Sequence, residues 1–284
     1  MDETRNIWLV VNARSGSNNE AALEAVQAAC GDHGFAVTRL ISFPDDKLPT
    51  AAELDAADIA EVAIFTGDGT LNAAVTRLYG WSGSIIVLPG GTMNLLSLRL
   101  HGDNDMATIL KRIADGACRR VRPQAARCEA GDALAGLLVG PGTAWANVRE
   151  AMRDFDVAGV AQHAGEAVAK TTGAALARCA NPLVGHDEGY PLIEVTPSHR
   201  GMQLDGFRAE DAGEFLQQSW ALLRRNFREG PHDRLGLLDE VTIENVAGEP
   251  LEVLIDGEPA TLPARATFTV AACEVDLLAT HHGF

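Results

Sequence analysis

The first 115 or so residues alternate short apolar runs with stretches of helical spacing, and this alternation constrains the fold more than any other feature. The apolar runs that read as strands lie at 7–11, 35–41, 61–65 and 84–88. Helices are expected between and after them, at 21–30, 48–57, 71–79, 95–100 and 106–114. Repeated strand–helix units of this length predict an α/β domain with a doubly wound parallel sheet.

After Gly116 the pattern changes to strand signals mixed with helices at 143–152, 158–176 and 212–227. Such a mixture without strand–helix regularity predicts a second, β-rich domain with antiparallel sheets. The predicted domains are 1–117 and 118–284, and the last segment is a candidate for a return to the first domain. No internal repeat or low-complexity linker separates them.

Composition narrows the possible partners. The net charge of −16 argues against nucleic acid and against strong attraction to an anionic membrane. Five scattered cysteines without a C-x-x-C pair indicate reduced thiols, and no apolar stretch approaches the ~20 residues of a membrane span. We therefore expect a cytoplasmic protein and leave open peripheral contact with a membrane and a homodimer. Two arginine clusters, at 119–127 and 224–234, could meet phosphate, although a solvated face is the simpler interpretation.

Three polar loops follow predicted strands, at 12–18, 66–72 and 89–94. Because the carboxyl ends of parallel strands meet at one edge of a sheet, these loops should gather there. Glycines let the backbone approach a ligand, and the free N–H groups of a helix start favour a phosphate. The loop Thr66-Gly67-Asp68-Gly69-Thr70-Leu71-Asn72 is neither a Walker A loop nor a G-x-G-x-x-G fingerprint.

Taken in order, the three loops resemble the diacylglycerol kinase catalytic family, which has N-P-x-S-G, G-G-D-G-T-x-N and P-x-G-T-x-N patterns. The segment Ile255-Asp256-Gly257-Glu258 is similar to the family's later D-G-E. The resemblance covers about 6–100 and 236–279. It implies ATP and Mg²⁺ as cofactors, a nucleotide domain, a β-rich domain and an active site in the cleft between them. It also implies a lipid or lipid-like alcohol as acceptor, such as diacylglycerol.

The resemblance assigns roles to individual residues. Those implied to hold the nucleotide phosphates and Mg²⁺ are Gly67, Asp68, Gly69, Thr70 and Asn72, with Asp68 as the metal ligand by way of ATP. The residues implied to line the same pocket are Asn12, Thr92, Asn94 and Ser42, which stands just after the second predicted strand. Asp256 matches the catalytic Asp that deprotonates or orients the acceptor hydroxyl, and Glu258 would support it. An Asp beside phosphates is repelled unless Mg²⁺ or a hydrogen-bonded network intervenes.

The chain also departs from the family's patterns. Ala13 replaces a proline, and Thr66 replaces the first glycine of G-G-D-G, which forbids any backbone conformation that only glycine adopts. Leu235 stands where many members carry a ligand for a structural metal, so we do not expect that metal. Two alternatives remain open, an NAD kinase-type enzyme and a non-catalytic nucleotide- or lipid-binding protein. Asp256-Gly257 alone would be an ordinary hairpin turn.

Overall fold

The computed structural model describes residues 4–12, 19–102, 105–140, 176–207 and 232–281. The chain forms two compact units. The first comprises Met1–Pro123 together with Ala272–Phe284, and the second comprises Gln124–Ala271. The sequence-based boundary was 117/118, with a return of the last segment left open.

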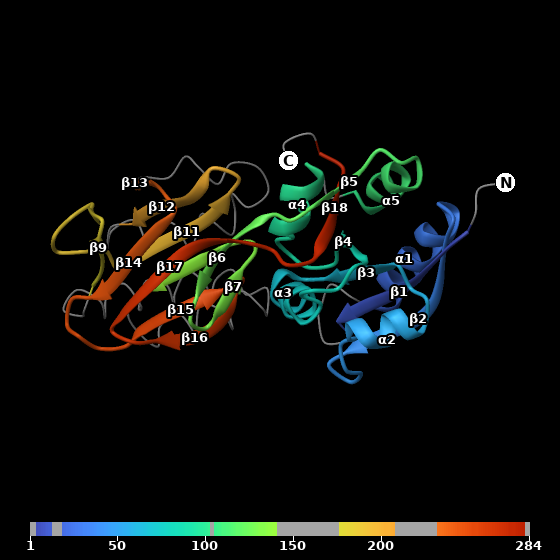
Figure 1. Cartoon of the computed structure of the whole chain (residues 1–284), viewed down its shortest axis with the longest axis horizontal. Coiled ribbons are helices and arrows are strands. Elements are labelled where there is room, and N and C mark those ends of the chain that lie inside the picture. Colours follow the sequence, from blue (N-terminus) through green and yellow to red (C-terminus); the bar gives the residue numbers. More distant parts are fainter. Residues whose placement is uncertain (1–3, 13–18, 103–104, 141–175, 208–231, 282–284) are drawn as a thin grey trace. The chain divides into compact units, whose positions relative to one another are not determined.

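The first unit is built on one six-stranded sheet, whose strands are drawn in blue to green in Figure 1 except for β18, which is red. In spatial order its strands are β2 (Phe35–Phe43), β1 (Arg5–Asn12), β3 (Glu61–Thr66), β4 (Ser84–Pro89), β18 (Asp276–Ala279) and β5 (Arg119–Val121). All neighbours run parallel except β5, which is antiparallel to β18. The last strand of the chain therefore lies inside the sheet formed by the first segment.

Helices cover this sheet on both faces. They are α1 (Glu20–Asp32), α2 (Ala51–Ala56), α3 (Asp68–Arg77), α4 (Leu95–His101) and α5 (Met106–Ala114). Every residue of β3 is buried, as expected for a parallel strand covered on two sides. One face packs against α1 and α5 through residues such as Val26 and Ile109. The prediction of a doubly wound parallel sheet is confirmed, with one antiparallel strand added at its edge.

Several predicted boundaries were wrong for local reasons. Helix α1 continues through Gly31, and α2 begins only after Thr50, which forms a capping box with Glu53. Helix α3 begins at Asp68, so the polar loop is shorter than its sequence suggested. Ser42 lies inside β2 and not after it.

The second unit consists of two six-stranded sheets whose strand pairs are antiparallel. The first contains β10 (Leu183–Val184), β9 (Ala177–Asn181), β14 (Glu240–Asn245), β17 (Arg265–Ala272), β6 (Gln124–Cys128) and β7 (Gly131–Ala133). The second contains β13 (Asp233–Leu238), β12 (Gly201–Phe207), β11 (Leu192–Ser198), β8 (Leu137–Gly140), β15 (Leu251–Ile255) and β16 (Glu258–Leu262). A shared apolar core, with Phe268 from one sheet and Ile193 from the other, joins them face to face.

This architecture confirms the predicted β-rich, antiparallel second part. The helices expected at 143–152, 158–176 and 212–227 lie outside the described residues, apart from the last position of the second.

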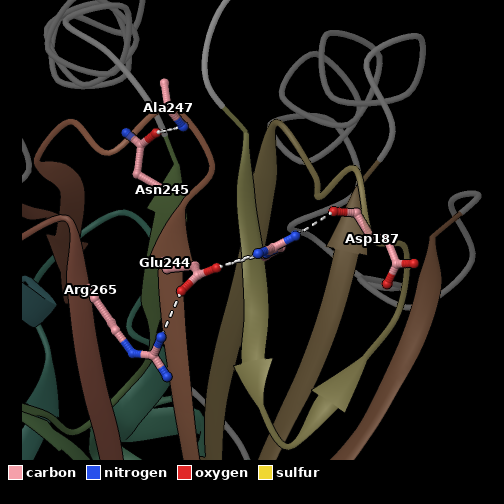
Figure 2. A network of polar contacts seen from close by, with 6 residues as sticks. Asp187, Glu244, Asn245, Ala247 and Arg265 are labelled. Carbon is pink, nitrogen blue, oxygen red and sulfur yellow. Dashed lines mark hydrogen bonds and ion pairs between the residues drawn. The ribbon is translucent and has the colours of Figure 1, made fainter.

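Three neighbouring strands of the second unit are tied together by a charged network on one face (Figure 2). Glu244 of β14 accepts from Arg178 of β9 at 2.8 Å and from Arg265 of β17 at 2.9 Å. Arg178 also donates to the backbone oxygen of Asp187 at 3.2 Å. Partly exposed ion pairs contribute little singly, so this network serves mainly to fix the register of the three strands.

In the described ranges no helix is long and apolar enough to cross a bilayer. All five cysteines are free thiols, and four of them are buried. Burial raises the pKa of Cys30 and of Cys179 to about 11, so these thiols are packing residues rather than nucleophiles.

Candidate active site

The loops after β1, β3 and β4 begin at the same edge of the first sheet. Val11 pairs with Phe65, and Thr66 pairs with Pro89, so the three strands end level with one another. The side-chain amide of Asn12 donates to the hydroxyl of Thr70 at 2.9 Å, which joins the end of β1 to the first turn of α3. Two residues predicted for the site from separate motifs are therefore in contact.

Two glycine-rich loops pack directly on each other. A Cβ on Gly91 would lie 2.4 Å from the Cα of Gly67, and a Cβ on Gly90 would lie 2.4 Å from the backbone carbon of Phe65. Since such contacts are far below van der Waals distance, only glycine fits at these two positions. Gly67 in turn is the N-cap of the ten-residue helix α3, and as a glycine it has no side chain to cap that helix. The positive end of the helix dipole at this position favours an anion.

Asn94 closes the Pro89–Asn94 loop. Its side chain accepts from the N–H of Gly91 at 2.7 Å and donates to the oxygen of Gly91 at 2.8 Å, while its backbone is left-handed with φ 52°. Asp68 reaches across from the neighbouring loop. Its two carboxylate oxygens accept from the N–H groups of Leu95 and Leu96, each at 3.1 Å.

The carboxyl of Asp68 is poorly solvated. Burial raises its pKa, and hydrogen bonds from backbone N–H groups of Leu96, Leu95, Asn94 and Asp68 itself oppose that rise. The negative charge is therefore held by amide dipoles at the start of α4. A hydrogen-bonded network was one of the two ways in which an Asp could be tolerated beside a phosphate site, and the structure contains such a network.

Thr66, which replaces a glycine of the motif, is the last residue of β3 and is only 2% exposed. Its hydroxyl donates to the oxygen of Gly67 at 3.2 Å. In the described part of the chain, the non-glycine residues with positive φ are Asp58, Asn94 and Asp256, so Thr66 needs no glycine-only conformation. Its side chain is therefore buried and is not exposed at the loop surface.

The remaining predicted nucleotide residues lie around this edge. Ser42 donates its N–H to the carboxylate of Asp46 at 2.9 Å and pairs with Val11 across β1 and β2. Thr92 is exposed at the tip of its loop. Gly69 and Asn72 belong to the first half of α3.

Asp256 lies in the second unit, at the tip of the β15–β16 hairpin. Both loop residues have positive φ, 49° for Asp256 and 88° for Gly257, which identifies a type I′ turn. The carboxylate of Asp256 accepts from three consecutive N–H groups, those of Leu134, Ala135 and Gly136, each at 2.8 Å. Asp256 is 8% exposed, whereas Glu258 at the start of β16 is exposed. The turn is therefore locked to the loop between β7 and β8.

His101, at the end of α4, is a buried residue that the sequence did not single out. Its Nε2 lies 3.0 Å from the oxygen of Val87, and its Nδ1 lies 3.0 Å from the hydroxyl of Thr280. Because a carbonyl only accepts, Nε2 carries the proton and Nδ1 accepts from Thr280. Burial lowers the pKa of His101 to about 4, with the Val87 hydrogen bond opposing the shift and Arg112 adding to it. A lone histidine in an apolar helix offers no pattern that would have revealed these contacts.

Residues 6–125 match the sequence model of the family described as diacylglycerol kinase catalytic domain. A search of curated proteins finds no match. Among solved structures, the chain is similar to a diacylglycerol kinase from Bacillus anthracis str. Sterne, with 15% identity, 98% of each chain covered and a TM-score of 0.60. It is also similar to a provisionally assigned diacylglycerol kinase from the same organism, with 14% identity, 100% of this chain and 98% of that chain covered and a TM-score of 0.61. At 14–15% sequence identity, the structural similarity to these proteins establishes the fold alone.

Proposed function

Since residues 6–125 belong to the diacylglycerol kinase catalytic domain family, we propose that the protein is an ATP-dependent kinase that phosphorylates a lipid or lipid-like alcohol, such as diacylglycerol. The observation that carries the proposal is that the ends of β1, β3 and β4 meet at one sheet edge, where the Asn12–Thr70 hydrogen bond and the Gly67–Gly91 contact join them. Phosphoryl transfer depends on positioning and charge stabilisation, which backbone N–H groups at such an edge provide.

The residues at this sheet edge fit the phosphates of a nucleoside triphosphate. The start of α3 carries the positive end of a helix dipole, and its N-cap residue Gly67 has no side chain that would compete with a phosphate. We assign the phosphates to Gly67, Gly69 and Thr70, with Asn12, Ser42, Asn72, Thr92 and Asn94 as the surrounding polar residues.

Mg²⁺ would neutralise charge on the phosphates when it is bound with the nucleotide. In the described ranges no three His, Cys, Asp or Glu side chains are grouped to hold a metal ion. The metal is therefore expected to arrive on ATP, and the phosphate oxygens would be its main ligands. The sequence resemblance made Asp68 the protein ligand, but its oxygens already accept hydrogen bonds from α4.

On the acceptor side we assign Asp256 the role of orienting the acceptor hydroxyl and accepting its proton as the oxygen bonds to the γ-phosphorus and ADP leaves. Three N–H donors hold the carboxylate in one orientation, which is what a carboxylate that orients an acceptor hydroxyl requires. Glu258, exposed beside it, would support this carboxylate. We also propose an active site in a cleft between the two units. A lipid acceptor would in addition require peripheral contact with a membrane.

The test is transfer of labelled γ-phosphate from Mg·ATP to a panel of lipid alcohols in vesicles, with NAD as an added acceptor. We expect at least one lipid to be labelled, and we expect Asp256→Asn to abolish labelling. Because Asp256 also holds the 134–136 loop, ATP affinity and melting temperature must be measured on the same variant. Unchanged ATP affinity with lost transfer supports the catalytic role.

One observation favours a second candidate, a non-catalytic nucleotide-binding protein. The three N–H donors and the type I′ geometry of Asp256 are what a purely structural hairpin turn would show. ATP binding without phosphorylation of any lipid in the panel would support this candidate. Labelling of NAD alone would instead favour the NAD kinase-type alternative and overturn the lipid proposal.

A further inference from the structure

Helix α4 lacks a cap of its own. Asn94 occupies the N-cap position, where an asparagine side chain normally accepts a hydrogen bond from the first turn. Here both polar atoms of that side chain are turned back to Gly91, and the helix has no capping hydrogen bond from its N-cap residue. The N–H groups at the start of α4 would therefore remain unsatisfied without an acceptor from elsewhere.

Asp68 supplies this acceptor from the neighbouring loop. One carboxylate oxygen receives the N–H of Leu95 and the other receives the N–H of Leu96, both at 3.1 Å. The contact spans 27 residues of sequence, and it joins the first turn of α3 to the first turn of α4. Since a carboxylate favours the positive end of a helix, the pairing stabilises α4 in a defined position.

This position matters for the glycine contact. Gly91 lies against Gly67 with no space for a Cβ, and Asn94 ties Gly91 to the start of α4. A shift of α4 would therefore move Gly91 relative to Gly67 and change the surface that both loops present.

We propose that Asp68 is a positioning residue, whose carboxylate holds α4 and the Pro89–Asn94 loop against Gly67 and does not ligate Mg²⁺. The inference rests on the proposed function, because it assigns the role of one residue in the same donor site. The two possible roles of Asp68, positioning and metal ligation, differ in measurable ways. A metal ligand contributes only when Mg²⁺ is present, whereas a positioning residue acts on the loops with or without metal.

The test compares Asp68→Asn with a matched control, Asp105→Asn. Asp105 is the exposed N-cap of α5 and accepts from the N–H of Thr108 at 2.8 Å, so it makes the same kind of contact away from the three loops. Binding of Mg·ATP and of ATP with excess EDTA is measured by calorimetry. We expect Asp68→Asn to weaken both by a similar factor of about ten, since it removes charge-assisted hydrogen bonds. Asp105→Asn should change neither.

Weakening of Mg·ATP binding alone, or its recovery at high Mg²⁺ concentration, would overturn the proposal in favour of metal ligation. A readout without nucleotide separates this inference from the proposed function. Amide hydrogen exchange at Leu95 and Leu96 should be slow in the wild type and faster in Asp68→Asn. If the protein binds no ATP, the donor-site assignment fails, but exchange at these two amides still decides whether Asp68 holds α4.

Should Asp68→Asn fail to fold, the wild-type protein provides the decisive measurement. The amide chemical shifts of Leu95 and Leu96 should titrate together with the Asp68 carboxyl as pH is lowered. Shifts that stay constant through that titration would contradict the proposed contact.

Discussion

Gly91 is one of two glycines in the candidate site that leave no space for a side chain. Gly91→Ala would place a methyl group 2.4 Å from the Cα of Gly67, which is backbone and cannot rotate away. We expect a loss of about 1–3 kcal/mol in unfolding free energy from the forced separation of the loops, together with weaker ATP binding. Chemical denaturation and calorimetry measure the two effects.

The control is Gly31→Ala. Gly31 lies within α1, and a Cβ there would meet nothing within 4 Å. Alanine in place of glycine should stabilise a helix by up to about 1 kcal/mol, so this variant should gain stability and keep its ATP affinity. Equal behaviour of the two alanine variants would contradict the close packing of the loops.

Thr66 tests whether the departure from the glycine motif limits nucleotide binding. Its side chain is buried at the end of β3, and its own φ is not positive. Restoring glycine should therefore give no gain in ATP affinity. Thr66→Gly should instead lower the unfolding free energy by about 1–2 kcal/mol, because a buried side chain is lost from a strand. A clear gain in ATP affinity would show that the threonine does obstruct the site.

At this scale the sequence predicted that the strand ends would meet at one edge of the sheet, but not which side chains would join them. Asn12 and Thr70 were both expected there, and they bond to each other. The contact of Asp68 with α4 could not be foreseen, because it depends on Asn94 turning its side chain back to Gly91. That Asp68 caps α4 in place of Asn94 depends on how the two loops pack, and the spacing of residues in the sequence does not reveal it.

Among the elements, α4 is held at both ends, by Asp68 at its start and by His101 at its finish. The imidazole of His101 bonds to β4 through Val87 and to the residue after β18 through Thr280. A charged imidazolium at this buried position would lack hydration, and this desolvation cost lowers the pKa of His101.

The pH dependence of stability follows from His101. Its pKa is lowered from 6.5 to about 4, so the unfolded state binds the proton more tightly than the folded state. Its contribution is complete above pH ~6.5 and is lost as pH falls toward ~4, with an upper limit of about 3 kcal/mol. Urea denaturation between pH 7 and 4 should show this loss, and His101→Gln should show a smaller one. An equal slope in the variant would exclude His101 as the source.

The boundaries of helices and strands were predictable where the local sequence alone determines them. The parallel strands and their order of appearance followed from apolar runs separated by helical spacing. The start of α3 was placed three residues too late, at Leu71 instead of Asp68, because Asp68 and Gly69 read as loop residues. Their helical state comes from the hydrogen bond of Leu71 to Gly67 and from packing against the Pro89–Asn94 loop.

For the whole molecule, the central feature is the return of the chain to its first sheet. Strand β18 lies between β4 and β5, and Leu277 within it is fully buried. The N–H of Cys273 donates to the oxygen of Pro123 at 2.9 Å, so the chain enters and leaves the second unit at adjacent points. The second unit is thus an insertion into the first. Sequence spacing could raise this return only as a possibility, since β18 has no local signal for its partners.

This topology predicts how the chain can be divided. A fragment of residues 1–123 lacks β18 and should not fold stably, because β5 loses its neighbour and β4 gains an open edge. Joining residue 123 to residues 272–284 through a short glycine linker should restore folding, since the two ends already lie within hydrogen-bonding distance. Circular dichroism and cooperative thermal unfolding measure the difference. The joined fragment with Leu277→Asp is the control, and it should behave like 1–123 because it buries a charge in the sheet. Cooperative folding of 1–123 alone would show that β18 only docks on a finished domain, and the view of the second unit as an insertion would then be wrong.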